Sequence, residues 1–212
     1  MDGFPTSEGA RLVHALAQVI RENAQQLSDI DGLIGDGDHG INMRKGFMLA
    51  DEQARGGLDV ATSLQALGAV LIEQIGGAMG PLYGSFFRAM ARAARGREAI
   101  DAATFSAMLN GALDRVRELG GAEVGDKTLL DTLAPAVAAF DSAVAEGGDF
   151  AHALDAMKSA AERGRDSTRD LIARKGRASR LGERSRGVVD AGAASCCLIL
   201  CTMADTMRGS LA

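Results

Sequence analysis

Three carboxylates lie close together between Ile30 and Met43, where the sequence reads Ile-Asp-Gly-Leu-Ile-Gly-Asp-Gly-Asp-His-Gly-Ile-Asn-Met. Asp31 precedes a glycine-rich turn, and Asp36 and Asp38 lie within it, separated by one glycine. Carboxylate oxygens are hard ligands that suit Mg²⁺ or Ca²⁺. Three carboxylates at one site repel one another unless a cation neutralises them. A helix cap would explain one aspartate but not three, so the turn predicts one or two bound Mg²⁺ ions.

The same turn leads into a predicted helix, which gives it a second chemical property. Backbone N–H groups at a helix N-terminus can donate hydrogen bonds, and the helix dipole favours negative charge there, so the turn can hold a phosphate. His39 and Asn42 could donate to phosphate oxygens, or His39 could accept a phosphoryl group covalently. We favour donation, because the flanking carboxylates hinder an anionic phosphoryl group that arrives without a metal. Metal and phosphate together indicate a nucleotide and phosphoryl transfer.

The elements that position these residues are predicted to be helices. Only 4% of the 212 residues are aromatic and only three are proline, whereas strands collect aromatic and β-branched residues. Apolar spacing and glycine or proline boundaries predict eight helices, at about residues 8–28, 40–55, 60–76, 81–96, 104–119, 127–145, 150–173 and 191–209. Gly56 and Gly57 are expected to end the second helix, Thr104 to cap the fifth, and Pro135 to kink the sixth. We therefore predict a single all-α domain over residues 1–212.

Four polar, glycine-containing joints fall at predicted helix starts, at residues 35–40, 76–80, 125–127 and 190–192. If the helices form a bundle with these ends together, four helix N-termini face one region and favour a bound anion. The joint at 76–84 is not a Walker A loop, because it has no Gly-Lys-Ser/Thr ending. The sequence therefore predicts a nucleotide site at one end of the bundle.

Charge and cysteine content limit the classes of partner. A net charge of −5 argues against a nucleic-acid partner. Basic residues gather between Arg174 and Arg186, either as a solvated loop or as a site for one small anion. Cys196, Cys197 and Cys201 lie in one apolar run, which is typical of buried thiols in a reducing compartment. Because neither a signal peptide nor a bilayer-spanning apolar run is recognisable, we expect a cytoplasmic protein without a membrane partner.

Five segments, in this order, resemble the L subunit of dihydroxyacetone kinase, the nucleotide-binding half of that enzyme. They are Ile34–Met43, Gly76–Gly84, Gly125–Asp131, Lys175–Ser185 and Asp190–Ser195. Each segment is a weak signal alone, but the set is specific. The resemblance implies an eight-helix antiparallel barrel with ADP or ATP and two Mg²⁺ ions at one end. It also implies that the substrate, a small ketose such as dihydroxyacetone, is held covalently by a separate K subunit.

The residues that match the family's site fall into three groups. The implied metal ligands are Asp31, Asp36 and Asp38. The implied nucleotide contacts are His39, Gly40, Ile41, Asn42, Ala78, Met79, Gly120, Leu129, Arg177, Asp190, Ala191 and Gly192. The implied catalytic residues are His39, which orients the transferred phosphoryl group, and Arg177, which offsets charge on the nucleotide.

The chain departs from the family pattern at several positions. Met79 replaces the serine of the usual Gly-Gly-Ala-Ser-Gly loop, which removes a hydroxyl contact to phosphate and leaves the backbone N–H. Ala191 stands where proline is usual, and Ala194 where threonine is common. His39 resembles separate L subunits, whereas fused ATP-dependent kinases tend to carry cysteine at that position.

Three hypotheses follow for the function. The first is a phosphoryl-transfer subunit that is active only with a K subunit. Its nucleotide is either a permanently bound ADP, rephosphorylated by a phosphohistidine protein of the phosphotransferase system, or an exchanging ATP. The second is a nucleotide-sensing regulatory subunit without transfer activity, which binds a transcriptional regulator or a kinase. The third, a helical lipid carrier, gives no reason for clustered carboxylates. A homodimer stays open in each case.

Overall fold

The computed structural model describes residues 3–54 and 57–211. These residues form eight α-helices, namely α1 (Gly9–Ile34), α2 (His39–Ala54), α3 (Val60–Gln74), α4 (Met79–Ala94), α5 (Ala102–Gly120), α6 (Leu130–Ala145), α7 (Phe150–Ser167) and α8 (Ala191–Arg208). There are also three 3₁₀ helices, η1 (Thr6–Glu8), η2 (Thr168–Asp170) and η3 (Arg177–Ser185). The all-α class and the eight helices predicted from the sequence are confirmed. The expected end of the second helix, at residues 55 and 56, lies outside the described residues.

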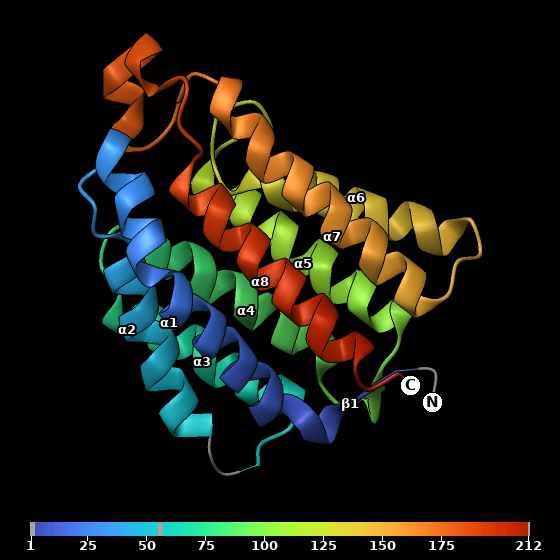
Figure 1. Cartoon of the computed structure of the whole chain (residues 1–212). Helices are drawn as coiled ribbons and strands as arrows, with labels where there is room; N and C mark the ends of the chain where they lie inside the picture. The colour runs from blue at the N-terminus through green and yellow to red at the C-terminus, as the bar shows by residue number, and fades with distance from the viewer. Residues whose placement is uncertain (1–2, 55–56, 212) are drawn as a thin grey trace.

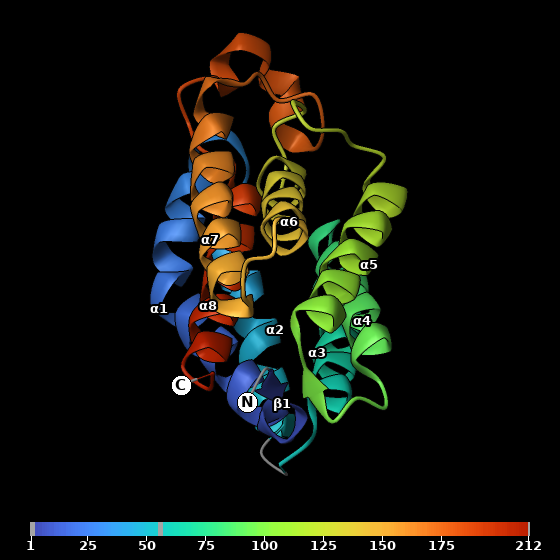
Figure 2. The same cartoon turned by 90° about the vertical axis from the view of Figure 1, so that its right-hand side faces the viewer.

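The helices form an antiparallel barrel (Figures 1 and 2). Each α-helix packs against the next one in the chain, and α8 packs against α1, which closes the ring. Because successive helices run in opposite directions, the N-termini of the even-numbered helices lie at the end where α1 finishes. The segment that contains η3 also lies at this end, while the strand β1 (Phe4–Pro5) and the last turn of α8 lie at the other (Figure 1).

Apolar side chains fill the interior of the barrel. Two groups of edge-to-face aromatic rings contribute to it, one around Phe87 and one around Phe140. The ring centroids of Phe47 and Phe87 are 5.7 Å apart, and those of Phe105 and Phe140 are 5.3 Å apart. Burying such a side chain contributes roughly 1.5–3 kcal/mol. The packed core therefore gives the helix ends a rigid support.

Helix α1 is longer than predicted, because it continues to Ile34 where the sequence analysis ended it at residue 28. Its apolar face explains the difference: Leu27 and Ile34 are buried and Ile30 packs against the core, so the helical spacing persists for two more turns. As a result Asp31 belongs to the last turn of α1.

Other boundaries differ for local reasons. Helix α5 begins at Ala102, because Asp101, and not Thr104, caps it by accepting a hydrogen bond from the Thr104 N–H at 2.7 Å. Helix α7 stops at Ser167 and passes into η2. Pro135 lies inside α6, which continues through it.

A short antiparallel pair, β1 (Phe4–Pro5) with β2 (Ala99–Ile100), was not predicted. Two residues per strand are too few to produce a detectable alternation. None of the helices in residues 3–54 and 57–211 is both long enough and apolar enough to cross a membrane.

Candidate functional site

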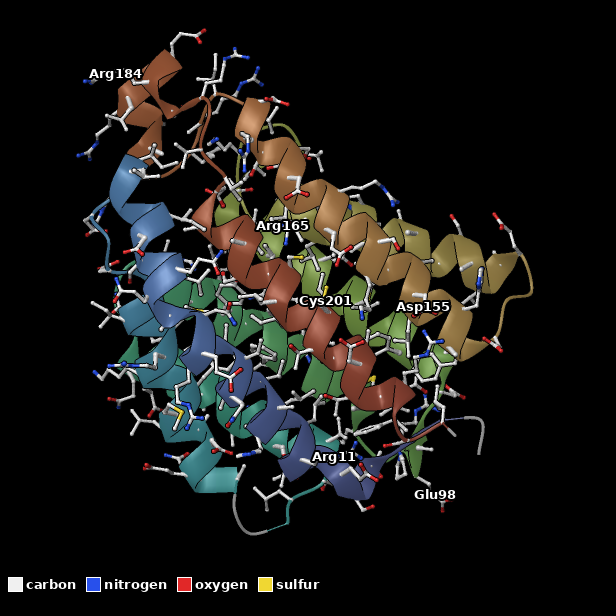
Figure 3. All side chains as sticks on the ribbon, in the orientation of Figure 1. Arg11, Glu98, Asp155, Arg165, Arg184 and Cys201 are labelled. Carbon is white, nitrogen blue, oxygen red and sulfur yellow. The ribbon has the colours of Figure 1, made fainter. Side chains whose placement is uncertain are left out.

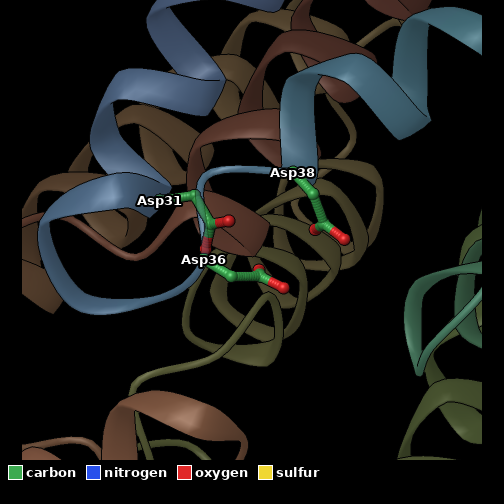
Figure 4. A group of neighbouring side chains, drawn as sticks. All are labelled: Asp31, Asp36 and Asp38. Carbon is green, nitrogen blue, oxygen red and sulfur yellow. The ribbon is translucent and has the colours of Figure 1, made fainter.

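The three aspartates come together where α1 ends and α2 begins. Asp31 lies in the last turn of α1, and Asp36 and Asp38 lie in the turn before α2. One carboxylate oxygen from each residue lies within 4.8 Å of the other two (Figure 4). Three negatively charged oxygen donors at this spacing form a set that suits Mg²⁺. The residues present therefore fit the ion that the sequence predicts.

Two glycines in this turn are required by close contacts. A Cβ atom on Gly35 would lie 2.3 Å from Oδ1 of Asp31, so a side chain there would displace the carboxylate. A Cβ atom on Gly40 would lie 1.8 Å from the carbonyl oxygen of Ala24, so Gly40 lets α2 start directly against α1. The glycines thus set the position of the carboxylates.

A cavity of about 480 Å³ lies beside the carboxylates. Its lining includes all three aspartates, residues 76–79 before and at the start of α4, residues 175–178, and the start of α8 at 190–191. The N-termini of α2, α4 and α8 therefore meet at this cavity. Free N–H groups and helix dipoles favour an anion there. The cavity thus combines acidic groups that hold a cation with helix ends that hold an anion.

A second cavity of about 440 Å³ shares residues with the first. Both are lined by Asp31, His39, Ala78 and Met79. The apolar part of the second cavity's lining comes from α4, α5 and the segment leading into α6, with Pro81, Leu82, Val116, Leu119, Ala122, Leu129 and Leu130. Lys127, Thr128 and residues 175–176 and 190–192 complete the lining. The two cavities together suit a ligand with a polyanionic end and a flat apolar end.

His39 connects the cavity to the core of the barrel. Its Nε2 atom lies 2.9 Å from the hydroxyl of Ser195, which in turn lies 2.6 Å from the hydroxyl of Tyr83. Burial lowers the pKa of His39 to about 4, so the ring is neutral at pH 7. The sequence analysis did not assign Tyr83 or Ser195, although both belong to the segments that carried the family resemblance.

Two cationic residues approach the cavity from the segment at residues 171–188, here called the cap segment. Lys175 and Arg177 line the first cavity, and the Arg177 guanidinium forms an ion pair with Asp36. Arg184 lies at the outer edge of η3 (Figure 3) and lines neither of the two cavities. The basic segment of the sequence therefore contributes only some of its charges to the site.

Lys127 holds the two ends of the cap segment together. Its ammonium group, which is buried, donates to the carbonyl oxygens of Thr168 and Val188. The carboxylate of Asp131 accepts from the N–H groups of Gly125 and Thr128, at 2.6 and 2.7 Å, and so fixes the turn that carries Lys127. The sequence analysis treated this motif as a helix-start joint and as part of the resemblance, and it missed the role of Lys127.

Asp190 caps α8, since its carboxylate accepts from the N–H of Ala193 at 2.8 Å. Burial raises the pKa of Asp190 to about 6. Asp190 and Ala191 line both cavities, so this cap is part of the site.

The structure brings most of the expected site residues to the two cavities. Those that line at least one cavity are Asp31, Asp36, Asp38, His39, Asn42, Ala78, Met79, Gly120, Leu129, Arg177, Asp190, Ala191 and Gly192. Gly40 and Ile41 line neither: Gly40 packs on Ala24, and the Ile41 side chain is 60% exposed. Any contact of these two residues with a ligand would involve the backbone.

Comparisons with known proteins define the class. Residues 33–205 match the DAK2 domain. The chain is 35% identical over 198 residues to the ADP-binding subunit of a PEP-dependent dihydroxyacetone kinase from Listeria innocua, covering 92% of this chain and 94% of that relative. It is 37% identical over 179 residues to the corresponding subunit from Escherichia coli, covering 84% of this chain and 85% of the relative.

A solved structure has the same fold. The crystal structure of dihydroxyacetone kinase from C. freundii in complex with AMP-PNP and Mg²⁺ superposes with a TM-score of 0.71 at 23% identity. The match covers 97% of this chain and 35% of that one, so this chain spans about a third of the solved protein. The barrel with its aspartate turn is a DAK2 domain. The chain belongs to the family of the ADP-binding L subunits of dihydroxyacetone kinase, as its sequence motifs indicated.

Proposed function

We propose that this chain is the nucleotide-binding, phosphoryl-transfer subunit of a kinase for dihydroxyacetone or a related small ketose. One observation carries the proposal. Three carboxylates converge at a cavity that is bounded by three helix N-termini and continues into an apolar cavity. This arrangement supports binding of a Mg²⁺ nucleotide, with its phosphates at the helix ends and its base among apolar side chains.

Each group of residues has a separate task in the transfer. Asp31, Asp36 and Asp38 would hold the metal ions. Mg²⁺ held there would supply positive charge that neutralises the charge developing on the transferred phosphoryl group. His39 and the backbone N–H groups at the start of α4 donate to the phosphates and orient them. Arg177 offsets the remaining negative charge. This transfer requires no covalent nucleophile among the described residues.

We infer that a separate K subunit holds the ketose and that the nucleotide bound to this chain is ADP. Two observations support the ADP arrangement over exchanging ATP. The relatives that match over nearly their whole length are named ADP-binding subunits of PEP-dependent kinases, and His39 is the residue typical of separate L subunits. We propose that a phosphohistidine carrier protein rephosphorylates the bound ADP.

Reconstitution tests the proposal. The purified chain, a K subunit loaded with dihydroxyacetone, Mg²⁺ and ADP are supplied either with a phosphohistidine carrier or with ATP, and the triose phosphate is measured. We expect turnover with the carrier, and the rate should be unchanged after free ADP has been removed by dialysis. Turnover only with ATP would overturn the ADP arrangement. Tight ADP–Mg²⁺ binding without any transfer would instead identify a nucleotide-sensing regulatory subunit.

A further inference from the structure

Three buried polar side chains from three helices form a hydrogen-bonded row that ends at the nucleotide cavity. Tyr83 of α4, Ser195 of α8 and His39 of α2 are each less than a tenth exposed. The Tyr83 hydroxyl lies 2.6 Å from the Ser195 hydroxyl, which lies 2.9 Å from Nε2 of His39. Burying three polar groups in this core is costly unless each is hydrogen-bonded, so their exact partners matter.

The second ring nitrogen of His39 faces the cavity. Within the described residues, the only buried side-chain N or O atom that lacks a hydrogen-bond partner is Oγ of Ser28. Nδ1 of His39 also makes no hydrogen bond there, so it is not fully buried. Nδ1 is therefore accessible from the cavity that His39 lines. Toward a ligand in that cavity, Nδ1 is either a hydrogen-bond donor or an acceptor.

The Tyr83 hydroxyl can donate to Ser195 or to the Gly192 carbonyl oxygen, 3.1 Å away. For the His39 ring, two arrangements of protons satisfy the row. In the first, Tyr83 donates to Ser195 and Ser195 donates to Nε2 of His39, which leaves Nδ1 protonated. In the second, Nε2–H donates to Ser195 and Ser195 donates to the Gly192 carbonyl oxygen, 3.1 Å away, which leaves Nδ1 as an acceptor. Both arrangements use the same heavy-atom positions, because hydroxyl groups rotate freely. The ligand in the cavity therefore selects between them.

A phosphate oxygen accepts hydrogen bonds and repels a nitrogen lone pair. We propose that Tyr83 and Ser195 are positioning residues that stabilise the Nδ1–H tautomer of His39 once a phosphate selects it, so that the ring donates to the bound nucleotide phosphate. This inference rests on the proposed nucleotide function. Ser195 supplies the donor that Nε2 needs in the core, and the Tyr83 hydroxyl strengthens that donor through the shared chain of hydrogen bonds.

The tautomer can be read directly from the ring nitrogens. The chain has only three histidines, so a protein labelled with ¹⁵N-histidine gives a simple two-bond ¹H–¹⁵N spectrum, and His39→Gln assigns the His39 signals. In the complex with ADP and Mg²⁺ we expect His39 as the Nδ1–H tautomer. Ser195→Ala should give a mixture of tautomers and weaken ADP–Mg²⁺ binding about fivefold to tenfold, the effect of one hydrogen bond. Tyr83→Phe should change the tautomer ratio of His39 and the affinity for ADP–Mg²⁺ in the same direction as Ser195→Ala, but to a smaller extent.

Thr132→Val is the matched control. Thr132 is also buried and donates to the Ala193 carbonyl oxygen in the first turn of α8, at 3.1 Å, but it does not contact His39. This variant should leave the His39 tautomer and ADP affinity unchanged. An Nε2–H tautomer in the wild-type complex, or a Ser195→Ala variant with the wild-type tautomer and affinity, overturns the inference while nucleotide binding itself stands. Failure of the wild type to bind ADP–Mg²⁺ would overturn the proposed function, and this inference with it.

Discussion

Arg177 of η3 forms an ion pair with Asp36 in the turn before α2. The pair joins the cap segment to one of the three carboxylates that we assign to metal binding. A divalent cation and the guanidinium therefore compete for the same carboxylate oxygens. Both side chains are more than 40% exposed, so the competition is weak, because exposed ion pairs contribute only about 0.2–1 kcal/mol.

Replacing this arginine should therefore have opposite effects on the two ligands. In Arg177→Ala we expect Mn²⁺ alone to bind up to about fivefold more tightly, since 1 kcal/mol is a factor of about five. Binding of ADP–Mg²⁺ should weaken, because a positive charge beside the phosphates is lost. Titration calorimetry measures both, with Arg180→Ala as a control that removes a charge from the same 3₁₀ segment. Parallel changes for metal and nucleotide would contradict this account.

Removing a carboxylate from the cluster should abolish metal-dependent nucleotide binding. For Asp38→Ala we expect ADP affinity in Mg²⁺ to fall by more than about 100-fold, since substitutions beyond the direct ligands already cost 10–100-fold. The helical circular dichroism spectrum should stay close to that of the wild type. Asp29→Ala, on the exposed face of α1, is the control. Unchanged ADP affinity in EDTA would show that the metal assignment is wrong.

A methyl group at residue 35 should weaken Mg²⁺ binding, as the loss of a metal ligand would. Its Cβ would lie 2.3 Å from Oδ1 of Asp31, so Gly35→Ala should displace that carboxylate and weaken Mg²⁺ binding at least tenfold, an effect of the size that misplaced ligands produce. Gly32→Ala is the control, because its Cβ would meet nothing closer than 3.9 Å. Within helix α1 this control should raise the free energy of unfolding by about 0.5–1 kcal/mol. Equal metal affinity in both variants would refute the close-contact argument.

Restoring the serine of the second phosphate loop should strengthen nucleotide binding. Met79 is the first residue of α4 and lines both cavities, so Met79→Ser places a hydroxyl beside N–H groups that already favour phosphate. We expect ADP–Mg²⁺ affinity to rise up to about tenfold, the effect of one hydrogen bond to a charged group after the loss of some apolar contact. Met79→Ala separates the hydroxyl from the change in size. Equal affinities for Ser and Ala would mean that only the backbone acts there.

Two buried groups should give opposite pH dependence of stability. The pKa of His39 falls from 6.5 to about 4 on folding, so its contribution is present above pH 6.5 and is lost as the pH falls toward 4, by about 3 kcal/mol. The pKa of Asp190 rises from 3.8 to about 6, so its charged form destabilises the fold increasingly as the pH rises from 4 to 6. The two effects partly cancel in the wild type.

Single substitutions should reveal each slope. Relative to the wild type, His39→Gln should gain stability on acidification from pH 6.5 to 4, because the histidine contribution to the loss is absent. Asp190→Asn, which keeps a helix cap, should instead lose stability over pH 6 to 4. Urea unfolding at several pH values, in EDTA and without nucleotide, measures the differences. Identical slopes for both variants and the wild type would show that neither group is buried as described.

The sequence was sufficient to predict the helices and the convergence of three aspartates at one turn. Only one glycine separates Asp36 and Asp38 in the chain, and Asp31 is near enough that a local turn brings all three together. Apolar periodicity and the glycine joints predicted eight helices and one end at which N-termini meet, whereas the closed barrel was implied only by the family resemblance. These features depend on local spacing, which a sequence shows directly.

Contacts between segments that are distant in the chain could not be predicted from the sequence. The hydrogen bond between Ser195 and His39 joins residues 156 positions apart, and the spacing of neither residue in the sequence predicts it. The Lys127 ammonium bonds two carbonyl oxygens, which have no side-chain signature. The short β1–β2 pair depends on the barrel to bring Phe4 beside Ile100.

Lys127 bonds residues at the base of the cap segment, and Arg177 pairs with Asp36, so residues 171–188 form an excursion tied to the barrel at its base and to the aspartate turn. Changes in the length or composition of such a loop are absorbed within it and leave the packing of the eight helices intact. The cap segment can therefore vary, while the aspartates and the barrel beneath remain as they are.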